Sequence, residues 1–197
     1  MNLTKKGEYA LRTLIRLGMA QSCGRDVVSV SELADRENLP FKFIENILQE
    51  LRKSGYVESK RGKDGGCRLA KPMKSITIGE LVRFIDGRLA PIGCASETDY
   101  EKCTCPDEQH CGLRMLMIDV RNAIARILDR YTLEDVVKVT LQKMERSGVN
   151  PPFQILMSKS TPGRTRVRVV KPARVEHADP LDGFFAIFDK AKSTFRR

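Results

Sequence analysis

The sequence predicts a mainly α-helical fold that contains one small β-hairpin. Apolar residues recur at intervals of three and four along several stretches, which is the spacing that one buried face of a helix requires. Hydroxyl side chains that can cap free backbone N–H groups precede four of these stretches: Thr4, Ser29, Thr77 and Thr132. A glycine-rich turn between two short strand-like runs predicts the hairpin, so we expect helices on both sides of it.

Three helices are predicted before the hairpin. The first covers about residues 5–19, and the second covers residues 30–37 behind a Ser29–Glu32 capping box. The third, over residues 41–54, follows a turn at Leu39-Pro40. Its apolar face consists of Phe41, Ile44, Ile47, Leu48 and Leu51. Two helices joined by a tight turn, the second with a polar outer face, are typical of a helix-turn-helix.

The hairpin after the third helix is basic and rich in glycine. Residues 56–61 and 67–69 are predicted strands, and residues 62–66 form the turn between them. Glycines let this tip approach a phosphate backbone closely, and Arg61 beside them suits a narrow minor groove. Helix and hairpin together predict a winged helix-turn-helix domain over residues 1–74 that binds double-stranded DNA. The alternative is a surface hairpin with solvated charges.

Two groups of side chains are candidates for the DNA contacts. Base-edge contacts are expected from the outer face of the third helix, at Lys42, Glu45, Asn46 and Gln49. Glu45 can accept a hydrogen bond from a cytosine amino group, and Asn46 can pair with adenine. Contacts to phosphates or to the minor groove are expected from Lys53, Lys60, Arg61, Gly62 and Lys63. The charge agrees, because residues 1–74 carry 15 basic and 9 acidic side chains, and a basic segment attracts polyanions.

A second segment, residues 75–148, is predicted to join two chains. Thr77 and Glu80 form another capping box, which starts a helix that ends at Gly87. From Gly112 onward, apolar residues repeat as in a coiled coil: Leu113, Leu116, Met117, Val120, Ile124, Ile127, Leu128 and Tyr131. This stripe is longer than one small domain needs, so we expect a dimerisation helix; the alternative is a core helix within one chain. A last helix is expected after Thr132.

The loop between these helices contains four cysteines: Cys94, Cys103, Cys105 and Cys111. Thiolates are the soft ligands that hold iron-sulfur clusters or zinc. All four could instead fill a closed tetrahedral zinc site that only stabilises the fold. A thiol oxidoreductase or a cluster carrier is a further alternative, but the sequence has no Cys-x-x-Cys pair next to a strand-helix unit. Cys23 and Cys67 are expected to be inert packing residues.

The sequence shows no candidate signal peptide or membrane span. The N-terminal apolar stretch is interrupted by Arg12 and Arg16, and no window approaches the roughly 20 apolar residues of a spanning helix. We therefore expect a cytoplasmic protein without a membrane partner. In the reducing cytosol, six cysteines favour metal or redox chemistry over disulfides.

The last segment, residues 149–197, differs in composition from the rest. Residues 158–174 carry six basic and no acidic side chains, which predicts a linker or a non-specific DNA arm. Beyond them, one helical face is shared by Phe184, Phe188, Ala191 and Phe195. We expect a short amphipathic helix that docks on its own core or binds a partner.

Over residues 1–148 the chain resembles the IscR and NsrR type of winged-helix transcription regulators. The resemblance rests on the joint order of Leu3-Thr4-Lys5-Lys6-Gly7-Glu8-Tyr9-Ala10, Leu51-Arg52-Lys53-Ser54-Gly55-Tyr56-Val57, Arg61-Gly62-Lys63-Asp64-Gly65-Gly66, and a cysteine loop before a long helix. It implies a homodimer, repressor or activator, that binds partly palindromic promoter DNA. It also implies an iron-sulfur cluster that sets DNA affinity in response to redox state, nitric oxide or iron-sulfur supply, and no enzymatic activity.

In cluster-binding members of this family, three loop cysteines hold the cluster and the fourth ligand varies. Cys105 and Cys111 have the family's spacing, while Cys94 lies further upstream than usual. Cys103 is an additional candidate, so either Cys103 or Cys105 is the middle ligand, or all four thiolates serve. The resemblance leaves a two-iron and a four-iron cluster both open.

The fourth ligand is the position where this chain departs most from the family. Glu8 sits where some members use a carboxylate of the first helix, supplied by the partner subunit. Arg114 occupies the place where others carry a histidine ligand, and His110 is available nearby. The resemblance thus implies Glu8 as a candidate ligand beside the cysteines.

Overall fold

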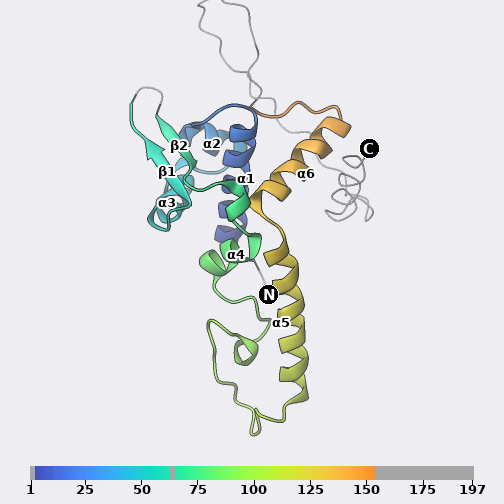
Figure 1. Ribbon diagram of the computed structural model, residues 1–197. Coiled ribbons are helices and arrows are strands. Elements are labelled where there is room, and N and C mark those ends of the chain that lie inside the picture. The colour runs from blue at the N-terminus through green and yellow to red at the C-terminus, as the bar shows by residue number, and fades with distance from the viewer. Residues whose placement is uncertain (1–2, 63–64, 154–197) are drawn as a thin grey trace, which may run out of the picture.

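The computed structural model describes residues 3–62 and 65–153, and Figure 1 shows a head from which one long helix projects. The head contains α1 (Lys5–Ser22), α2 (Val30–Glu37), α3 (Phe41–Lys53), β1 (Val57–Lys60) and β2 (Gly66–Leu69). The chain continues through η1 (Met73–Ser75), α4 (Ile78–Asp86), η2 (Gly93–Ala95), α5 (Gly112–Arg130) and α6 (Leu133–Arg146). The predicted mainly α-helical fold with one small antiparallel hairpin is confirmed for the described part of the chain.

Helix starts follow the hydroxyl caps that the sequence predicted. A backbone N–H of the first turn donates to the side chain of each cap: Thr4, Ser29, Thr77 and Thr132. At Thr132 a full capping box forms, because the Asp135 carboxylate also accepts from the Thr132 N–H at 3.0 Å. α2 ends at Asn38, whose φ of 53° lies in the left-handed region that asparagine tolerates. The chain can therefore turn directly into α3.

The capping boxes predicted at Ser29–Glu32 and Thr77–Glu80 are only half formed, which corrects that prediction. The Glu32 carboxylate accepts from the Arg25 guanidinium at 2.8 Å and 2.7 Å, and from Arg36 at 2.9 Å. The Glu80 carboxylate instead accepts from the Tyr56 hydroxyl at 2.5 Å. A carboxylate forms stronger bonds with a guanidinium than with a neutral backbone N–H, so the two arginine partners of Glu32 prevail.

One apolar core holds the head together. Its largest fully buried side chains come from all three helices of the head and from other segments: Leu14, Met19, Val28, Leu33, Ile44, Leu48, Leu51, Ile76, Leu81, Leu133, Val137 and Phe153. Burying one such aliphatic or aromatic side chain completely contributes about 1.5–3 kcal/mol. α6 packs against α1, so residues far beyond the hairpin complete this core. The division of the chain at residues 74 and 148 stays a prediction.

The hairpin is fastened through β2 to the loop before α2. β1 and β2 pair antiparallel, with Val57 opposite Leu69. An additional bridge joins Val28 to Cys67 in β2. A Cβ atom at Gly66 would collide with the Val28 carbonyl, so this close approach of two backbones requires glycine.

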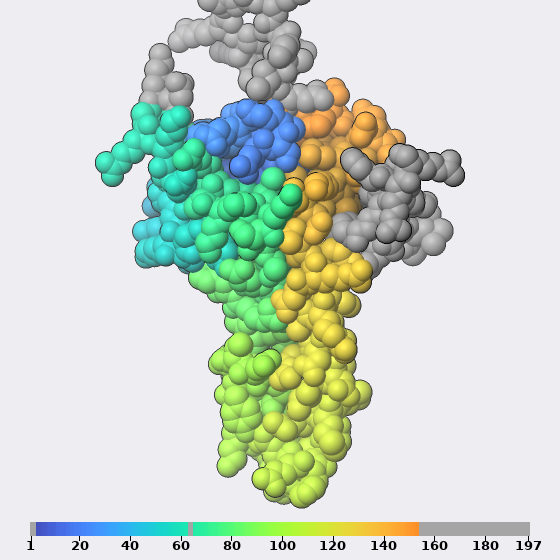
Figure 2. All heavy atoms as spheres, in the orientation of Figure 1, coloured from blue at the N-terminus to red at the C-terminus, as the bar shows by residue number. Residues whose placement is uncertain are grey.

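α5 projects from the head, and Figure 2 shows the preceding loop, residues 88–111, lying along one side of it. None of the residues of α5, all of which the structure describes, is buried. Leu113 and Leu116 are 59% and 56% exposed, and Met115 and Ile127 are also exposed. A row of large exposed apolar side chains on one helix is typical of a contact surface.

Three predictions lie outside the described residues. They are the amphipathic helix of Phe184 to Phe195, the role of the basic segment 158–174, and the phosphate contact of Lys63. Among the helices that the structure does describe, none combines the length and the apolar character needed to cross a membrane.

Candidate DNA-binding surface and cysteine loop

α3 is an amphipathic helix whose inner face belongs to the core. Its buried residues are Ile44, Ile47, Leu48 and Leu51. Lys42, Asn46 and Gln49 are exposed on the outer face, and Glu45 is partly exposed beside them. The Lys42 ammonium and the Glu45 carboxylate form an ion pair at 2.7 Å. This ion pair neutralises the charges of both side chains.

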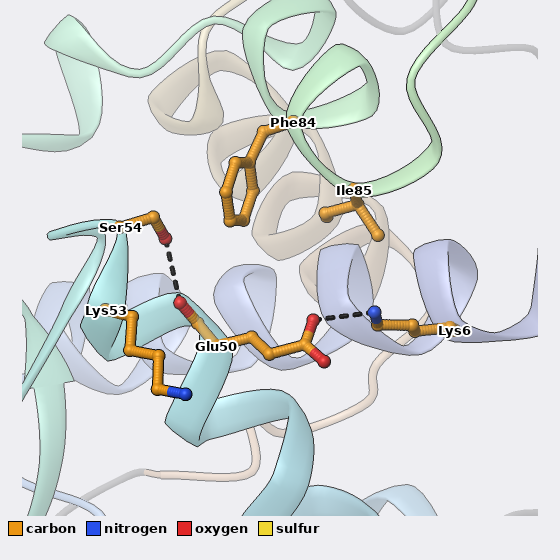
Figure 3. A pocket seen from close by; sticks show the side chains of 6 residues that line it. All are labelled: Lys6, Glu50, Lys53, Ser54, Phe84 and Ile85. Atoms are coloured by element: carbon orange, nitrogen blue, oxygen red, sulfur yellow. Dashed lines mark hydrogen bonds and ion pairs between the residues drawn. The ribbon is translucent and has the colours of Figure 1, made fainter.

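Lys53 lies at the other end of α3, beside a pocket of about 400 Å³ between α1, α3 and α4 (Figure 3). The pocket is lined by Lys6, Glu50, Lys53, Ser54, Phe84 and Ile85. Lys6 pairs with Glu50 at 2.7 Å, and Figure 3 shows Lys53 apart from that pair. The pocket is lined by both charged and apolar side chains. Lys53 adds a positive charge beside it, at the end of α3.

The wing exposes its basic residues at the far end of the hairpin. Lys60, Arg61 and Gly62 are all exposed, and Gly62 adopts a φ of 115°, which favours glycine. The structure thus places these three candidates together on the hairpin. It places Lys42, Glu45, Asn46 and Gln49 together on α3.

Two arginines that the sequence analysis did not single out hold the wing in place. The Arg68 guanidinium pairs with Asp26 at 2.8 Å and with Glu58 at 2.5 Å. Arg52 at the end of α3 donates to the Ser59 hydroxyl at 2.9 Å. Arg68 and Glu58 stand directly opposite each other on the two strands. Opposite charges at paired strand positions stabilise a hairpin, so this contact could have been predicted from the sequence.

The cysteine loop is attached to α5 by two arginines. Arg114 donates to the Cys94 carbonyl at 2.9 Å, and Arg121 donates to the Ala95 carbonyl at 2.8 Å. A guanidinium offers only donors and stays protonated, so Arg114 cannot replace a histidine as a metal ligand. It serves as a tether instead.

Cys103 interacts with two other thiols of the loop, Cys94 and Cys105. Burial raises the pKa of Cys94, and the neighbouring Cys103 thiol raises it further. A hydrogen bond with Cys103 and the charge of that group raise the pKa of Cys105 to about 11, with a smaller contribution from Cys111. Cys103 itself donates to Glu108 at 3.7 Å. At neutral pH Cys94 and Cys105 are therefore protonated thiols, which a bound cation would deprotonate.

The donor chemistry of the loop fits a thiophilic metal group, although its geometry is not that of a finished site. Within residues 3–62 and 65–153, no three His, Cys, Asp or Glu side chains stand in an arrangement ready to hold a metal ion. Cys94 is buried, Cys103 and Cys111 are partly buried, and Cys105 is exposed. Binding would require the thiols to converge.

Glu8 and His110 do not join the cysteines in this chain. Glu8 lies on α1, where it pairs with Lys5 at 2.9 Å and with Arg12 at 3.5 Å. The hydrogen bond from Lys5 lowers the pKa of Glu8. His110 is exposed and lies 2.8 Å from Asp107. A role for Glu8 as a ligand to a second chain's site stays a prediction.

The remaining two cysteines lie in the head. Cys67 is buried in β2, and Cys23 is partly buried after α1. Burial raises the pKa of both thiols, which keeps them protonated. Their surroundings fit the packing role that the sequence analysis expected.

α4 connects the projecting helix to the head. Arg83 forms two hydrogen bonds with the Asp129 carboxylate of α5, at 2.6 Å and 2.7 Å. Glu80 accepts from Tyr56 at the junction of α3 and β1, and burial followed by this bond raises the pKa of Tyr56. Asp86 accepts from the Thr4 N–H at 3.0 Å at the start of α1. One short helix thus contacts α5, the wing junction and α1.

Comparisons with known proteins match most of this chain. The model of the Rrf2 family, described as an iron-dependent transcriptional regulator, matches residues 3–139. A Rhodobacter capsulatus protein named as an rrf2-like HTH-type transcriptional regulator is 40% identical over 139 residues, which cover 68% of this chain and 91% of that protein.

Two solved structures share the fold. CymR, the global cysteine regulator of B. subtilis, superposes with a TM-score of 0.56 at 29% identity, over 70% of this chain and 97% of that one. IscR of T. potens gives a TM-score of 0.55 at 25% identity, over 73% of this chain and 90% of that one. Because the family match includes α3, the wing, the cysteine loop and α5, the chain belongs to the Rrf2 family of winged helix-turn-helix transcriptional regulators, which bind DNA and are not enzymes.

Proposed function

We propose that this regulator is a homodimer whose affinity for promoter DNA is set by an iron-sulfur cluster in the cysteine loop. The observation that carries the proposal is the attachment of a four-cysteine loop to α5, a helix with an exposed apolar row. The signal would be redox state, nitric oxide or iron-sulfur supply. The family's description as iron-dependent and the similarity to IscR support this assignment.

Dimer formation through α5 would cover the apolar side chains that the single chain leaves in water. Leu113, Leu116 and Ile127 are exposed and follow the spacing of a helix-pairing stripe. Two copies joined in this way present two α3 helices, and paired helix-turn-helix units read half-sites about 34–36 Å apart. A small change in the angle between the two copies then changes the fit to both half-sites at once.

The DNA contacts assigned from the sequence are consistent with this arrangement. Lys42, Glu45, Asn46 and Gln49 would contact base edges, since they share the outer face of α3. Lys53, Lys60, Arg61, Gly62 and Lys63 would contact phosphates or the minor groove. The first group would supply the sequence preference, and the second would supply most of the salt-dependent affinity.

Cys94, Cys105 and Cys111, with Cys103 as the alternative middle ligand, would hold the cluster. Glu8 of a second chain is the candidate fourth ligand, and a two-iron or a four-iron cluster suits these donors. When bound, the cluster would supply a redox-active group that can be oxidised, or lost when iron is short. Arg114 and Arg121 would keep the loop on α5, so a change in the shape of the loop would shift this helix.

The path from the loop to the DNA surface runs through residues of this chain. A shift of α5 displaces Asp129, and its two bonds to Arg83 carry the displacement to α4. α4 is in turn bonded to the wing junction through Glu80 and Tyr56. The wing and α3 would therefore change orientation together.

A zinc-based or thiol-based regulator is the alternative function for the same cysteines. The similarity to CymR, described as a global cysteine regulator, favours it. In this alternative the four thiols would fill one tetrahedral zinc site or form disulfides on oxidation.

Anaerobic purification of the full chain tests the proposal. We expect a brown protein that absorbs in the visible, contains iron and sulfide in equal amounts, and changes its affinity for a promoter fragment when the cluster is removed. The triple variant Cys94→Ser, Cys105→Ser, Cys111→Ser should be colourless, whereas the matched control Cys23→Ser should keep colour and regulation. A colourless wild-type protein that contains zinc would establish the alternative.

A further inference from the structure

The first residue of α3 departs from the pattern that the rest of this helix follows. The spacing of apolar residues predicted that Phe41 would share a buried face with Ile44 and Leu48, but the structure leaves Phe41 51% exposed. That prediction is therefore wrong for Phe41. Phe43, the other aromatic residue of this turn, does pack inward, with its ring edge-on to that of Tyr9 and 5.5 Å between the ring centres. One phenylalanine thus holds α3 to α1, and the other is left in contact with water.

Phe41 lies at the border between the core-facing side of α3 and its polar outer face. Successive residues of a helix are rotated by about 100°, so residues four apart lie close together on one face. Phe41 is therefore a neighbour of Glu45, which forms the ion pair with Lys42 at 2.7 Å. The Cα–Cβ bonds of a helix tilt toward its N-terminus, which directs the side chain of Phe41 toward the start of α3.

The start of α3 is also the part of the helix from which bases are usually read. In helix-turn-helix proteins, the N-terminal residues of the second helix contact base edges in the major groove. α3 packs against α1, α2 and β1, and Figure 1 shows α3 and the hairpin on the opposite side of the head from α6. Phe41 therefore occupies a position from which a base can be reached, and the chemistry of its ring decides which group of the base it can contact.

A phenyl ring suits only one kind of group on the edge of a base pair. Polar groups of guanine, cytosine or adenine would lose water against the ring without gaining a hydrogen bond, which costs free energy. The C5 methyl of thymine is the apolar group that the major groove presents, and phenylalanine is among the side chains that contact it. Contact between the ring and this methyl removes apolar surface of both partners from water.

We propose that Phe41 is a specificity-determining residue that reads thymine, by packing its ring on the C5 methyl of one thymine in each half-site. The inference rests on the proposed function of α3 as the base-reading helix and adds a residue that the earlier assignment left out. The four residues assigned to base edges are all polar: Lys42, Glu45, Asn46 and Gln49. They can recognise donors and acceptors, whereas Phe41 adds recognition of a group that has neither.

Removal of single methyl groups from the DNA tests this contact. The full chain first selects its site from a pool of random duplexes, and each thymine of the selected half-sites is then replaced by deoxyuridine. This replacement removes the methyl and keeps the pairing and the O4 acceptor. Burial of one such group changes affinity by about fourfold. We therefore expect about fourfold weaker binding at one position in each half-site, and about 15-fold weaker binding when both are replaced.

Variants at Phe41 connect the effect to this side chain. Phe41→Ser should bind the thymine site and the deoxyuridine site equally, whereas Phe41→Leu keeps an apolar side chain and should still prefer thymine. Val149→Ser changes an apolar residue outside α3 that is 52% exposed, so it is the matched control and should keep the full methyl effect. Measurement at low salt keeps all variants on the DNA, because phosphate contacts are then strongest. Thermal unfolding of Phe41→Ser should match that of the wild type.

The outcomes separate this inference from the function proposed above. Half-sites without thymine, or wild-type binding that is indifferent to every thymine methyl, would overturn the contact and leave the regulator intact. A methyl effect that persists in Phe41→Ser would overturn it as well, because another side chain would then be responsible. Failure of the wild-type chain to select any site would overturn the proposed function itself.

Discussion

In the head, Leu14 and Ile44 are fully buried, whereas Leu113 and Leu116 on α5 are more than half exposed. The head encloses its apolar residues between three helices, a hairpin and α6, so one chain is sufficient for its core. Within the described residues, Leu113, Leu116 and Ile127 of α5 stay exposed, although the loop 88–111 lies along one side of the helix. The head thus positions the candidate DNA-contacting residues on a core built within one chain, whereas α5 keeps an exposed apolar row.

We expect the largest effect from a charge placed in the exposed apolar row of α5. Leu116→Glu places a carboxylate in the apolar row, so we expect a monomer by light scattering and promoter binding weaker by about 100-fold or more, since linked binding of two half-sites is lost. Leu116→Met keeps the apolar surface and should behave as the wild type. Unfolding of the head in urea should change in neither variant, and a dimer that persists in Leu116→Glu would remove α5 from the interface.

We expect the stability of the head to depend strongly on one buried carboxylate. The Glu37 side chain is 1% exposed and pairs with Arg12 at 2.7 Å and with Arg16 at 2.6 Å. Glu37→Ala removes the buried carboxylate that Arg12 and Arg16 share, and Arg12 keeps only its longer pair with Glu8. We therefore expect the free energy of unfolding to fall by about 3 kcal/mol. Urea denaturation measures this loss.

The control for Glu37 is an exposed pair in the same region. Glu50 pairs with Lys6 at 2.7 Å, and both side chains are about half exposed. Glu50→Ala should therefore cost less than about 1 kcal/mol. Equal losses in the two variants would show that burial of the carboxylate does not increase the contribution of its ion pairs to the free energy of unfolding.

The wing offers a smaller effect, confined to DNA binding. Arg61→Ala removes an exposed guanidinium at the hairpin end, and we expect a loss of about 1–3 kcal/mol in specific promoter binding. Lys74→Ala removes an equal charge from η1, outside the assigned surface, and provides the comparison. Unchanged promoter affinity in Arg61→Ala would exclude the wing from recognition.

The smallest expected effect concerns the connection between the two regions. A double-mutant cycle of Arg83→Gln and Asp129→Asn should give a coupling of up to about 1 kcal/mol, because this pair is partly exposed. Arg83 lowers the pKa of Asp129, so the coupling should be present above the ordinary carboxyl pKa of about 4 and should disappear as the pH falls through the lowered value. A coupling that is the same at pH 2 and pH 7 would contradict the ion pair.

The sequence predicted most of the head because its signals are local. Thr4 and Ser29 cap the helices that were expected there, and the turn at Leu39-Pro40 separates α2 from α3. Periodicity also predicted where α5 begins. Each of these features depends on neighbours within about four residues, which is the range that helical spacing and capping report.

Contacts between distant residues could not be predicted in this way. The bond between Arg83 and Asp129 joins residues 46 apart, and no periodic pattern indicates which of several arginines would make it. The return of Phe153 to the head is of the same kind. In the candidate site, the sequence indicated the four cysteines, while the tethers Arg114 and Arg121 were found only when α5 and the loop were seen side by side.

Arg114 and Arg121 bind main-chain carbonyls of the loop, and Arg114 also pairs with the Glu108 carboxylate at 3.3 Å. Both carbonyl contacts survive any change of side chain at Cys94, Cys103, Cys105 or Cys111. The thiols can therefore be exchanged one at a time while the loop keeps its place on the helix.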